Sequence, residues 1–218
     1  MVEAKKFEIK KSKERKIEKE ILGVLVFLGV LIVIFLVASS YFRSLNSFEY
    51  QGLSFSKKRV GELQFYHHNY YLKVGQRLIN YNLYLRFDPR YNNVTVEGDK
   101  ANLLDAGSVA YVTVNSEGLQ ECRFSNLAVG TISSFLSDNQ MEVIGGNLDF
   151  WDAGATGVQW ITCENRQGNR VVEIYQGNET KVSIDGKCYK LEVADCQILE
   201  AVEKLEVQAI VDARKVVA

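Results

Sequence analysis

Four cysteines are the residues whose type and spacing most directly suggest chemistry: Cys122, Cys163, Cys188 and Cys196. Successive cysteines are 41, 25 and 8 residues apart. No CxxC motif is present for thioredoxin-type redox chemistry, and a four-cysteine zinc site usually shows paired short spacings. In a domain outside the cytoplasm, an even number of cysteines predicts disulfide bonds.

Four cysteines allow three pairings, so the connectivity is open. Cys188 and Cys196 flank a strand-like alternation, CYKLEVADC. They can bond only if the chain reverses sharply at Ala194-Asp195, because an extended strand rises about 3.3 Å per residue. We favour Cys188–Cys196 together with Cys122–Cys163.

His67 and His68 are the only histidines. Adjacent residues of a strand point to opposite faces, so the two rings cannot readily share one metal ion. One ring is expected to be half-buried and hydrogen-bonded and the other exposed. HExxH, GxSxG, P-loop and GxGxxG motifs are all missing from the sequence. We therefore predict no metal, no cofactor and no catalytic residue.

The stretch RFDPRYNN, residues 86–93, places two arginines around an Asp-Pro pair. An arginine fork could bind a carboxylate or phosphate there. The favoured interpretation is a turn that an Arg–Asp pair holds in place. For a hydrolase, Asp88, Asp99 and Asp105 could supply two carboxylates, but nothing in the sequence fixes their separation.

Tyrosines are concentrated near the start of the domain, and eight of the eleven lie between residues 41 and 91. Exposed tyrosines on a sheet suit protein or sugar contacts, although tyrosine is also a favoured strand residue. The candidate binding residues on the outward face and its end are Tyr84, Arg86, Asp88 and Arg90. Two sequons, at Asn93 and Asn178, are candidates for N-glycosylation.

A long apolar segment precedes the domain that carries these residues and is expected to hold it at a membrane. Residues 21–42 contain no charged side chain and span roughly 33 Å as a helix, enough to cross a bilayer. A cleaved signal peptide is the competing interpretation, but the segment exceeds the roughly 7–15 residues of a signal core. We predict an uncleaved transmembrane signal-anchor.

The charges beside this segment predict its orientation. Residues 1–20 carry eight Lys or Arg, and residues 43–62 carry four. The positive-inside bias therefore places a charged tail, residues 1–20, in the cytoplasm and the rest outside the cell.

Residues 43–218 are long enough for one domain with its own core. They carry 18 basic and 22 acidic residues without a basic block, which argues against nucleic acid as a partner.

Alternating apolar residues predict an α+β domain that is mainly antiparallel. The expected strands are residues 48–55, 61–72, 78–88, 108–115, 141–146, 158–164, 170–177, 180–185 and 188–193. Helical spacing predicts one internal helix at 125–139, with Ser125 as a possible N-cap, and a C-terminal helix at 197–218. The unit from 108 to 146 is strand–helix–strand and could be parallel.

Nearly the whole domain resembles uncharacterised single-pass exported proteins of small-genome archaea. The resemblance is carried by FEYQGLSF, YNLYLRFDPRYNNVTVEG, ITCENR, GNETK and CYKLEVADCQILEAVEKLEVQAIVDA. It implies a membrane location and a similar cysteine set, but no activity.

We therefore expect a membrane-anchored, disulfide-stapled domain with a non-catalytic binding or accessory role, its partner being an envelope protein or a glycan. A second hypothesis is an envelope hydrolase that uses carboxylates and a histidine. A third is that the transmembrane helix itself acts within a larger complex.

Overall fold

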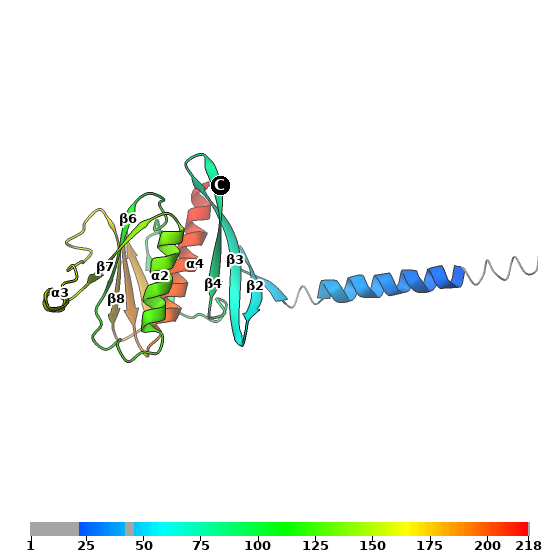
Figure 1. Cartoon of the computed structure of the whole chain (residues 1–218), viewed down its shortest axis with the longest axis horizontal. Coiled ribbons are helices and arrows are strands. Elements are labelled where there is room, and N and C mark those ends of the chain that lie inside the picture. Colours follow the sequence, from blue (N-terminus) through cyan, green and yellow to red (C-terminus); the bar gives the residue numbers. More distant parts are fainter. Residues whose placement is uncertain (1–21, 42–45, 218) are drawn as a thin grey trace, which may run out of the picture. The chain divides into compact units, whose positions relative to one another are not determined.

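The computed structural model describes residues 22–41 and 46–217 of the chain (Figure 1). The chain forms two compact units, residues 1–48 and 49–218. The first unit contains the apolar helix Leu22–Tyr41, with a mean hydropathy of 3.0. It is the one helix among the described residues that is long and apolar enough to cross a membrane. Its length and composition fit a membrane anchor or a signal sequence. The tail 1–20 and the predicted span ends 21 and 42 lie outside the described residues.

Sheet A is four-stranded, with the strands in the order β1-β2-β3-β4. Its strands are β1 (Ser47–Tyr50), β2 (Leu53–Val60), β3 (Leu63–Val74) and β4 (Arg77–Leu85). The β2–β3 and β3–β4 pairs are antiparallel, as the period-two alternation predicts. The expected strand 48–55 is divided because Gln51 and Gly52 have positive φ angles of 50° and 75° and form a turn.

Sheet B is six-stranded, with the order β5-β9-β10-β8-β6-β7. Its strands are β5 (Thr95–Gly98), β6 (Val109–Val114), β7 (Glu142–Asn147), β8 (Arg170–Gln176), β9 (Lys181–Asp185) and β10 (Cys188–Val193). Only the β9–β10 pair is antiparallel. The α+β class is confirmed, but the mainly antiparallel description fails for this sheet. The reason is that β10 inserts between β8 and β9, so β8 pairs in parallel with β10 instead of antiparallel with the next strand along the chain.

Two helices, α2 (Ser125–Asp138) and α4 (Ile198–Val217), lie between the two sheets (Figure 1). The predicted parallel β6–α2–β7 unit is confirmed. The N-cap of α2 is Phe124 rather than Ser125, because the Ser125 hydroxyl donates to the Leu119 carbonyl instead.

Helix α4 is buried on nearly all sides. Ile198 and Val202 lie on one face of the helix and are buried, and Leu199, Val207 and Ile210 on other sides are buried too. A helix buried all round belongs to a core with neighbours on both sides. This helix therefore completes the packing of both sheets.

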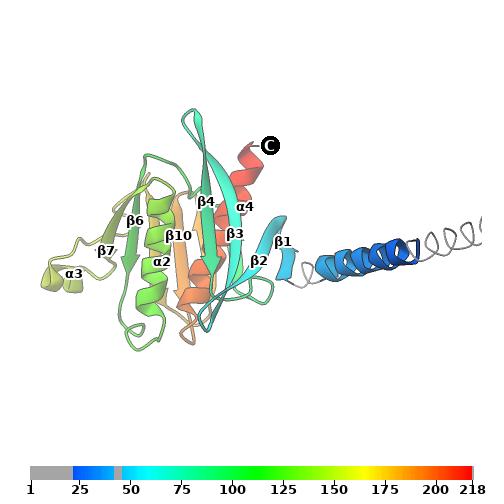
Figure 2. The same ribbon diagram turned by 45° about the vertical axis from the view of Figure 1, so that its right-hand side comes forward.

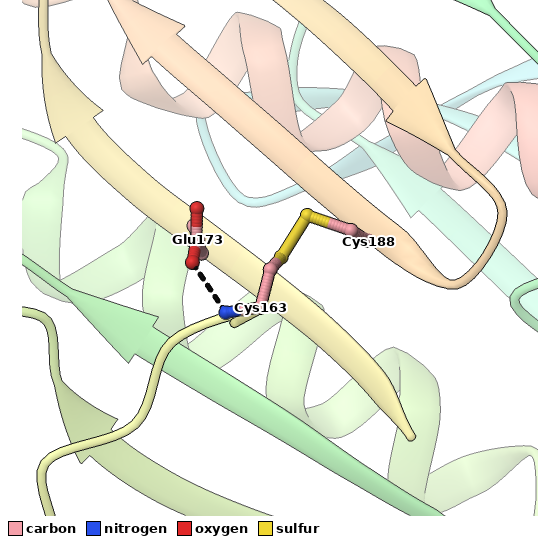
Figure 3. Close-up of side chains that lie close together, drawn as sticks. All are labelled: Cys163, Glu173 and Cys188. Carbon is pink, nitrogen blue, oxygen red and sulfur yellow. Dashed lines mark hydrogen bonds between the residues drawn. A yellow bond between two sulfur atoms is a disulfide. The ribbon is translucent and has the colours of Figure 1, made fainter. Parts of the chain in front are cut away.

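Both disulfides differ from the favoured pairing, because Cys122 bonds to Cys196. Cys163 bonds to Cys188 (Figure 3). Their Cα–Cα distances are 5.2 and 5.6 Å. Cys188 begins β10, whereas Cys196 lies beyond its far end and leads into α4. The chain does turn at 194–197, where the Gln197 backbone N–H donates to the Ala194 carbonyl (3.0 Å), but this turn does not return Cys196 to Cys188. Cys196 instead meets Cys122, which lies just before α2.

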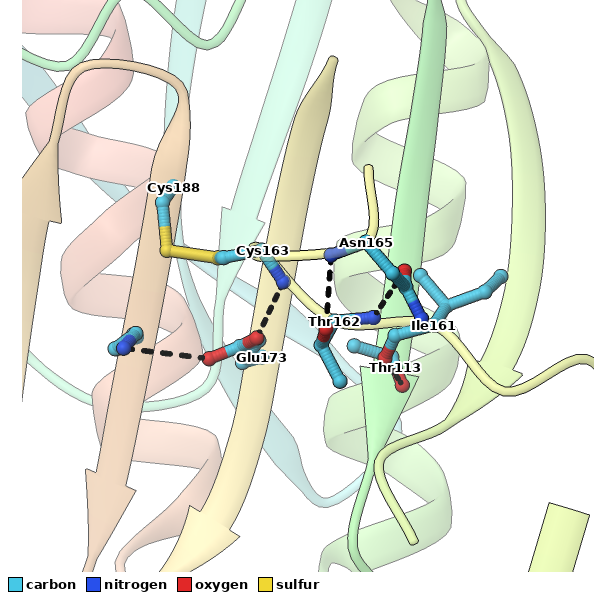
Figure 4. A network of polar contacts seen from close by, with 8 residues as sticks. Thr113, Ile161, Thr162, Cys163, Asn165, Glu173 and Cys188 are labelled. Carbon is cyan, nitrogen blue, oxygen red and sulfur yellow. Dashed lines mark hydrogen bonds and ion pairs between the residues drawn. A yellow bond between two sulfur atoms is a disulfide. The ribbon is translucent and has the colours of Figure 1, made fainter. Parts of the chain in front are cut away.

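The expected strand at 158–164 is a loop, apart from one bridge between Trp160 and Asn147. Side chains hold this loop on sheet B (Figure 4). The Thr113 hydroxyl donates to the Ile161 carbonyl (3.0 Å), and the Cys163 backbone N–H donates to Glu173 (2.6 Å). These bonds satisfy backbone groups that a strand would pair with a neighbour.

Candidate functional site

The predicted turn at Asp88-Pro89 is confirmed. Arg90 donates from Nε and Nη2 to the two Asp88 carboxylate oxygens, at 3.0 and 2.6 Å. Burial acts to raise the pKa of Asp88, but the hydrogen bonds from Arg90 outweigh it and hold this pKa below its ordinary value. Asp88 and Arg90 therefore satisfy each other's hydrogen-bonding groups, and their ion pair stabilises the turn.

The four predicted binding residues do not form one site. Arg86 points away from Asp88: its Nη1 donates to the Gln64 carbonyl (2.7 Å), and its guanidinium lies 5.8 Å from the Phe65 ring centre. Asp88 lines a cleft of about 400 Å³ beside the start of α4, whereas Tyr84 lines a different groove.

The predicted carboxylates and sequons are spread over several elements. Asp105 pairs with Arg170, and Asp99 accepts a hydrogen bond from the Gly186 backbone. Asn93 and Asn178 are exposed, so both sequons are accessible, and their glycosylation stays a prediction.

The two histidine rings lie on opposite faces of β3, as predicted, but both are buried. The ring of His67 lies 4.7 Å from the Tyr84 ring and bonds to Asn82 Oδ1 through Nε2 (2.8 Å). His68 donates from Nδ1 to the Ser54 carbonyl (2.9 Å), and burial lowers its pKa. The expectation of one exposed ring is wrong because Tyr84 lies against the His67 ring, and Phe55 lies against the His68 ring with centres 5.3 Å apart.

A groove of about 360 Å³ runs between β4 and α2, which lie side by side in Figure 2. It is lined by Tyr70, Tyr81, Asn82, Leu83, Tyr84, Asn126, Leu127, Gly130, Thr131, Ser134, Phe135, Asp138 and Glu206. Gly130 leaves the helix side open, since a Cβ added there would meet nothing within 4 Å. The groove therefore has a strand as one wall and a helix as the other.

The strand wall is an edge of a sheet. Strand β4 is the last strand of sheet A and pairs with β3 on one side only. Every second residue of such a strand directs its N–H and C=O away from the neighbour. Within the described chain, no backbone hydrogen bond joins the outer edge of β4 to another element along 78–84. These groups can pair with an added strand.

Helix α4 contributes one buried carboxylate to the groove. The Glu206 side chain is fully buried, and neither carboxylate oxygen has a hydrogen-bond partner among the described residues. Burial, followed by the nearby charge of Glu203, raises the pKa of Glu206 well above its usual range. Burial therefore disfavours the ionised form of this unpartnered side chain.

Tyrosine side chains surround the deep end of the groove. The rings of Tyr70 and Tyr81 stack with their centres 5.6 Å apart. The Tyr81 hydroxyl is buried without a partner among the described residues, whereas the Tyr70 hydroxyl donates to Asn139 Oδ1 (3.1 Å). Burial raises the pKa of both phenols, so both stay neutral.

A second cluster lies on the outer face of sheet B, where the Cys163–Cys188 disulfide is next to Glu173 (Figures 3 and 4). The two sulfurs and a Glu173 oxygen lie within 4.8 Å of one another, a spacing that could suit a metal ion. Both sulfurs are bonded to each other, which leaves the carboxylate as the one available ligand. Lys190 Nζ lies 3.9 Å from that carboxylate.

The short helix α3 (Phe150–Thr156) carries an exposed aromatic cluster that the sequence analysis missed. The Phe150 ring centre lies 5.5 Å from Trp151 and 5.3 Å from Trp160. Asp149 caps the helix by accepting from the Trp151 and Asp152 backbones, and Gly157 ends it with a φ of 69°. Asp149 and Gly157 are the sequence signals that could have located α3.

No protein-family model, curated protein or solved structure matches this chain. The resemblance to archaeal exported proteins therefore stays a prediction. Any assignment of function rests on the geometry of the groove between β4 and α2.

Proposed function

We propose that this protein is a single-pass, N-in membrane protein whose extracytoplasmic domain binds an extended segment of an envelope protein in the groove between β4 and α2. The observation that carries the proposal is an unpaired sheet edge that forms one wall of a groove of about 360 Å³. An extended peptide adds to such an edge through main-chain hydrogen bonds, while adjacent pockets select alternate side chains.

The proposed location rests on three observations. The helix Leu22–Tyr41 is long enough to span a bilayer, and lysine and arginine are more numerous before it than after it. The two disulfides fit an oxidising compartment. Together they favour a domain held on the outer face of a cell membrane.

The described clefts give the hydrolase hypothesis less support. The cleft that contains Asp88 is not lined by either histidine, and both histidines already bond to neighbouring groups. General acid and base groups must converge on one reacting position. We therefore propose a binding or accessory role, with a protein segment as the ligand.

A matched pair of glycine variants tests this proposal. Gly130 lines the groove, and Gly154 lies in α3 away from the groove lining; both are exposed, and a Cβ at either meets nothing within 4 Å. The full chain in lipid nanodiscs is used to select binders from a random decapeptide display library. We expect Gly130→Leu to weaken the selected peptides at least tenfold in Kd and Gly154→Leu to leave Kd unchanged, as measured by fluorescence anisotropy.

The proposal fails if no peptide is enriched, or if the enriched peptides bind Gly130→Leu as tightly as the unaltered protein. Binding of oligosaccharides with no peptide binding would identify a glycan as the ligand instead. Far-UV circular dichroism checks that both variants are folded.

A further inference from the structure

We propose that the groove selects a segment carrying a lysine or arginine side chain, whose cationic head binds the Glu206 carboxylate at the deep end of the groove. This inference rests on the proposed function and names the chemistry of the segment. It follows from the charge of the lining, the position of Glu206 and a comparison of the buried acids of α4.

The three fully buried acids of α4 differ in what they bind. Glu203 accepts the backbone N–H groups of Arg86 (2.5 Å) and Phe87 (3.1 Å). Asp212 accepts from the Ala101 backbone (2.9 Å) and from Gln208 (2.7 Å). These two acids connect α4 to neighbouring segments and satisfy donors there.

Glu206 has no comparable structural task. Among the described residues nothing donates to it, although it is as deeply buried as its two neighbours. A buried polar group without a partner costs free energy, and an apolar side chain of similar size would avoid that cost. Such a group, in the lining of a groove, points to a ligand that supplies the missing partner.

The rest of the lining fits a cation. Among the described residues of this lining, the ionisable acids are Glu206 and Asp138, and none is a lysine, arginine or histidine. The rings of Tyr70, Tyr81 and Phe135 line the same space, and aromatic faces attract ammonium and guanidinium groups. A peptide added along β4 directs alternate side chains toward the interior, where one can reach Glu206.

Binding of the cation changes the protonation of the groove. In the described part of the chain, the titratable groups that share the groove or interact with Glu206 are Tyr70 of β3, Tyr81 of β4, Asp138 of α2 and Glu203 of α4, and none of them is basic. In the free protein, burial disfavours the ionised form of Glu206. An incoming ammonium or guanidinium stabilises the carboxylate, so the O–H bond breaks and one proton leaves to the buffer.

The decapeptide library provides the test, with the full chain and a Glu206→Gln variant as baits. Gln is close in size to the protonated acid and cannot ionise. We expect Lys or Arg at one fixed position of the peptides selected by the unaltered protein and no such preference with Glu206→Gln. Replacing that Lys or Arg by norleucine is expected to weaken binding to the unaltered protein at least tenfold and to change Kd for Glu206→Gln by less than threefold.

Calorimetry in two buffers of different ionisation enthalpy gives an independent readout, with release of about one proton expected for the basic peptide and none for the norleucine peptide. Enriched peptides without a basic position, or basic peptides that release no proton, overturn the inference and leave the strand-addition function intact. Enrichment of no peptide overturns both.

Discussion

Replacing Cys122 and Cys196 together by alanine is expected to lower the free energy of unfolding by about 4 kcal/mol, one of the two largest effects we expect. Their bridge closes a loop of 74 residues, and a disulfide stabilises a fold mainly by restricting the unfolded chain. Cys163–Cys188 closes a loop of 25 residues, so Cys163→Ala with Cys188→Ala should cost less, about 3 kcal/mol. Denaturant unfolding in detergent micelles, followed by far-UV circular dichroism, measures both.

The control is a double variant that removes one cysteine from each of the two bridges. Cys188→Ala with Cys196→Ala leaves one cysteine of each bridge unpaired, so it should remove both disulfides and cost more than either matched pair. If instead this variant retained one disulfide by non-reducing peptide mapping, the pairing of Cys122 with Cys196 would be refuted.

The second large effect is a loss of stability as pH rises. Burial raises the pKa of Glu203 to about 8 and that of Glu206 well above its usual range. The unfolded chain loses these protons near the ordinary value of 4.5. Between pH 4.5 and these raised pKa values, the folded state therefore binds more protons than the unfolded chain. This contribution to the free energy of unfolding is fully present below pH 4.5, and about 3 to 5 kcal/mol of it is lost as pH rises through 8.

Glu206→Gln separates the two contributions, because its side chain keeps one proton state at every pH. We expect this variant to lose less stability than the unaltered protein between pH 5 and pH 8.5 in urea unfolding. Glu117→Gln, at an exposed glutamate, is the control and should leave the pH dependence unchanged. An identical slope for Glu206→Gln and the unaltered protein would show that Glu206 is ionised in the folded state.

Periodicity in the sequence predicts most of the elements, because side-chain alternation and helical spacing report burial directly. The residues of β3, β4, β6, α2 and α4 follow these patterns, and the structure places them as expected. The order of strands in sheet B is a different matter. This order depends on which strand edges pair when the chain folds. No local pattern in the sequences of β8, β9 and β10 indicates that β10 inserts between β8 and β9.

Two local predictions fail for the same reason, since each depends on contacts far along the chain. The apolar alternation of 158–164 reads as a strand, yet Thr113 and Glu173 hold it as a loop on sheet B. The short spacing of Cys188 and Cys196 suggests a local bridge, yet Cys196 bonds to a cysteine that precedes it by 74 residues.

The groove was only partly visible in the sequence. Tyr84 is the one predicted binding residue that lines it. If only one face of α4 is taken to be apolar, Glu206 is expected to be an exposed charged residue of an amphipathic helix. The available signal was that Leu199, Val207 and Ile210 lie off that face, which indicates a helix buried all round and therefore buried acids.

The position of α4 also sets the order in which the domain can assemble. Ribosomes make β1 to β10 before they reach Ile198, yet this last helix shares with α2 the layer between the two sheets (Figure 1). A nascent chain that ends before Cys196 lacks α4 from the layer between the two sheets and leaves Cys122 without its partner. Such a chain presents exposed apolar surface and a free thiol, two features by which quality-control factors recognise unfinished proteins.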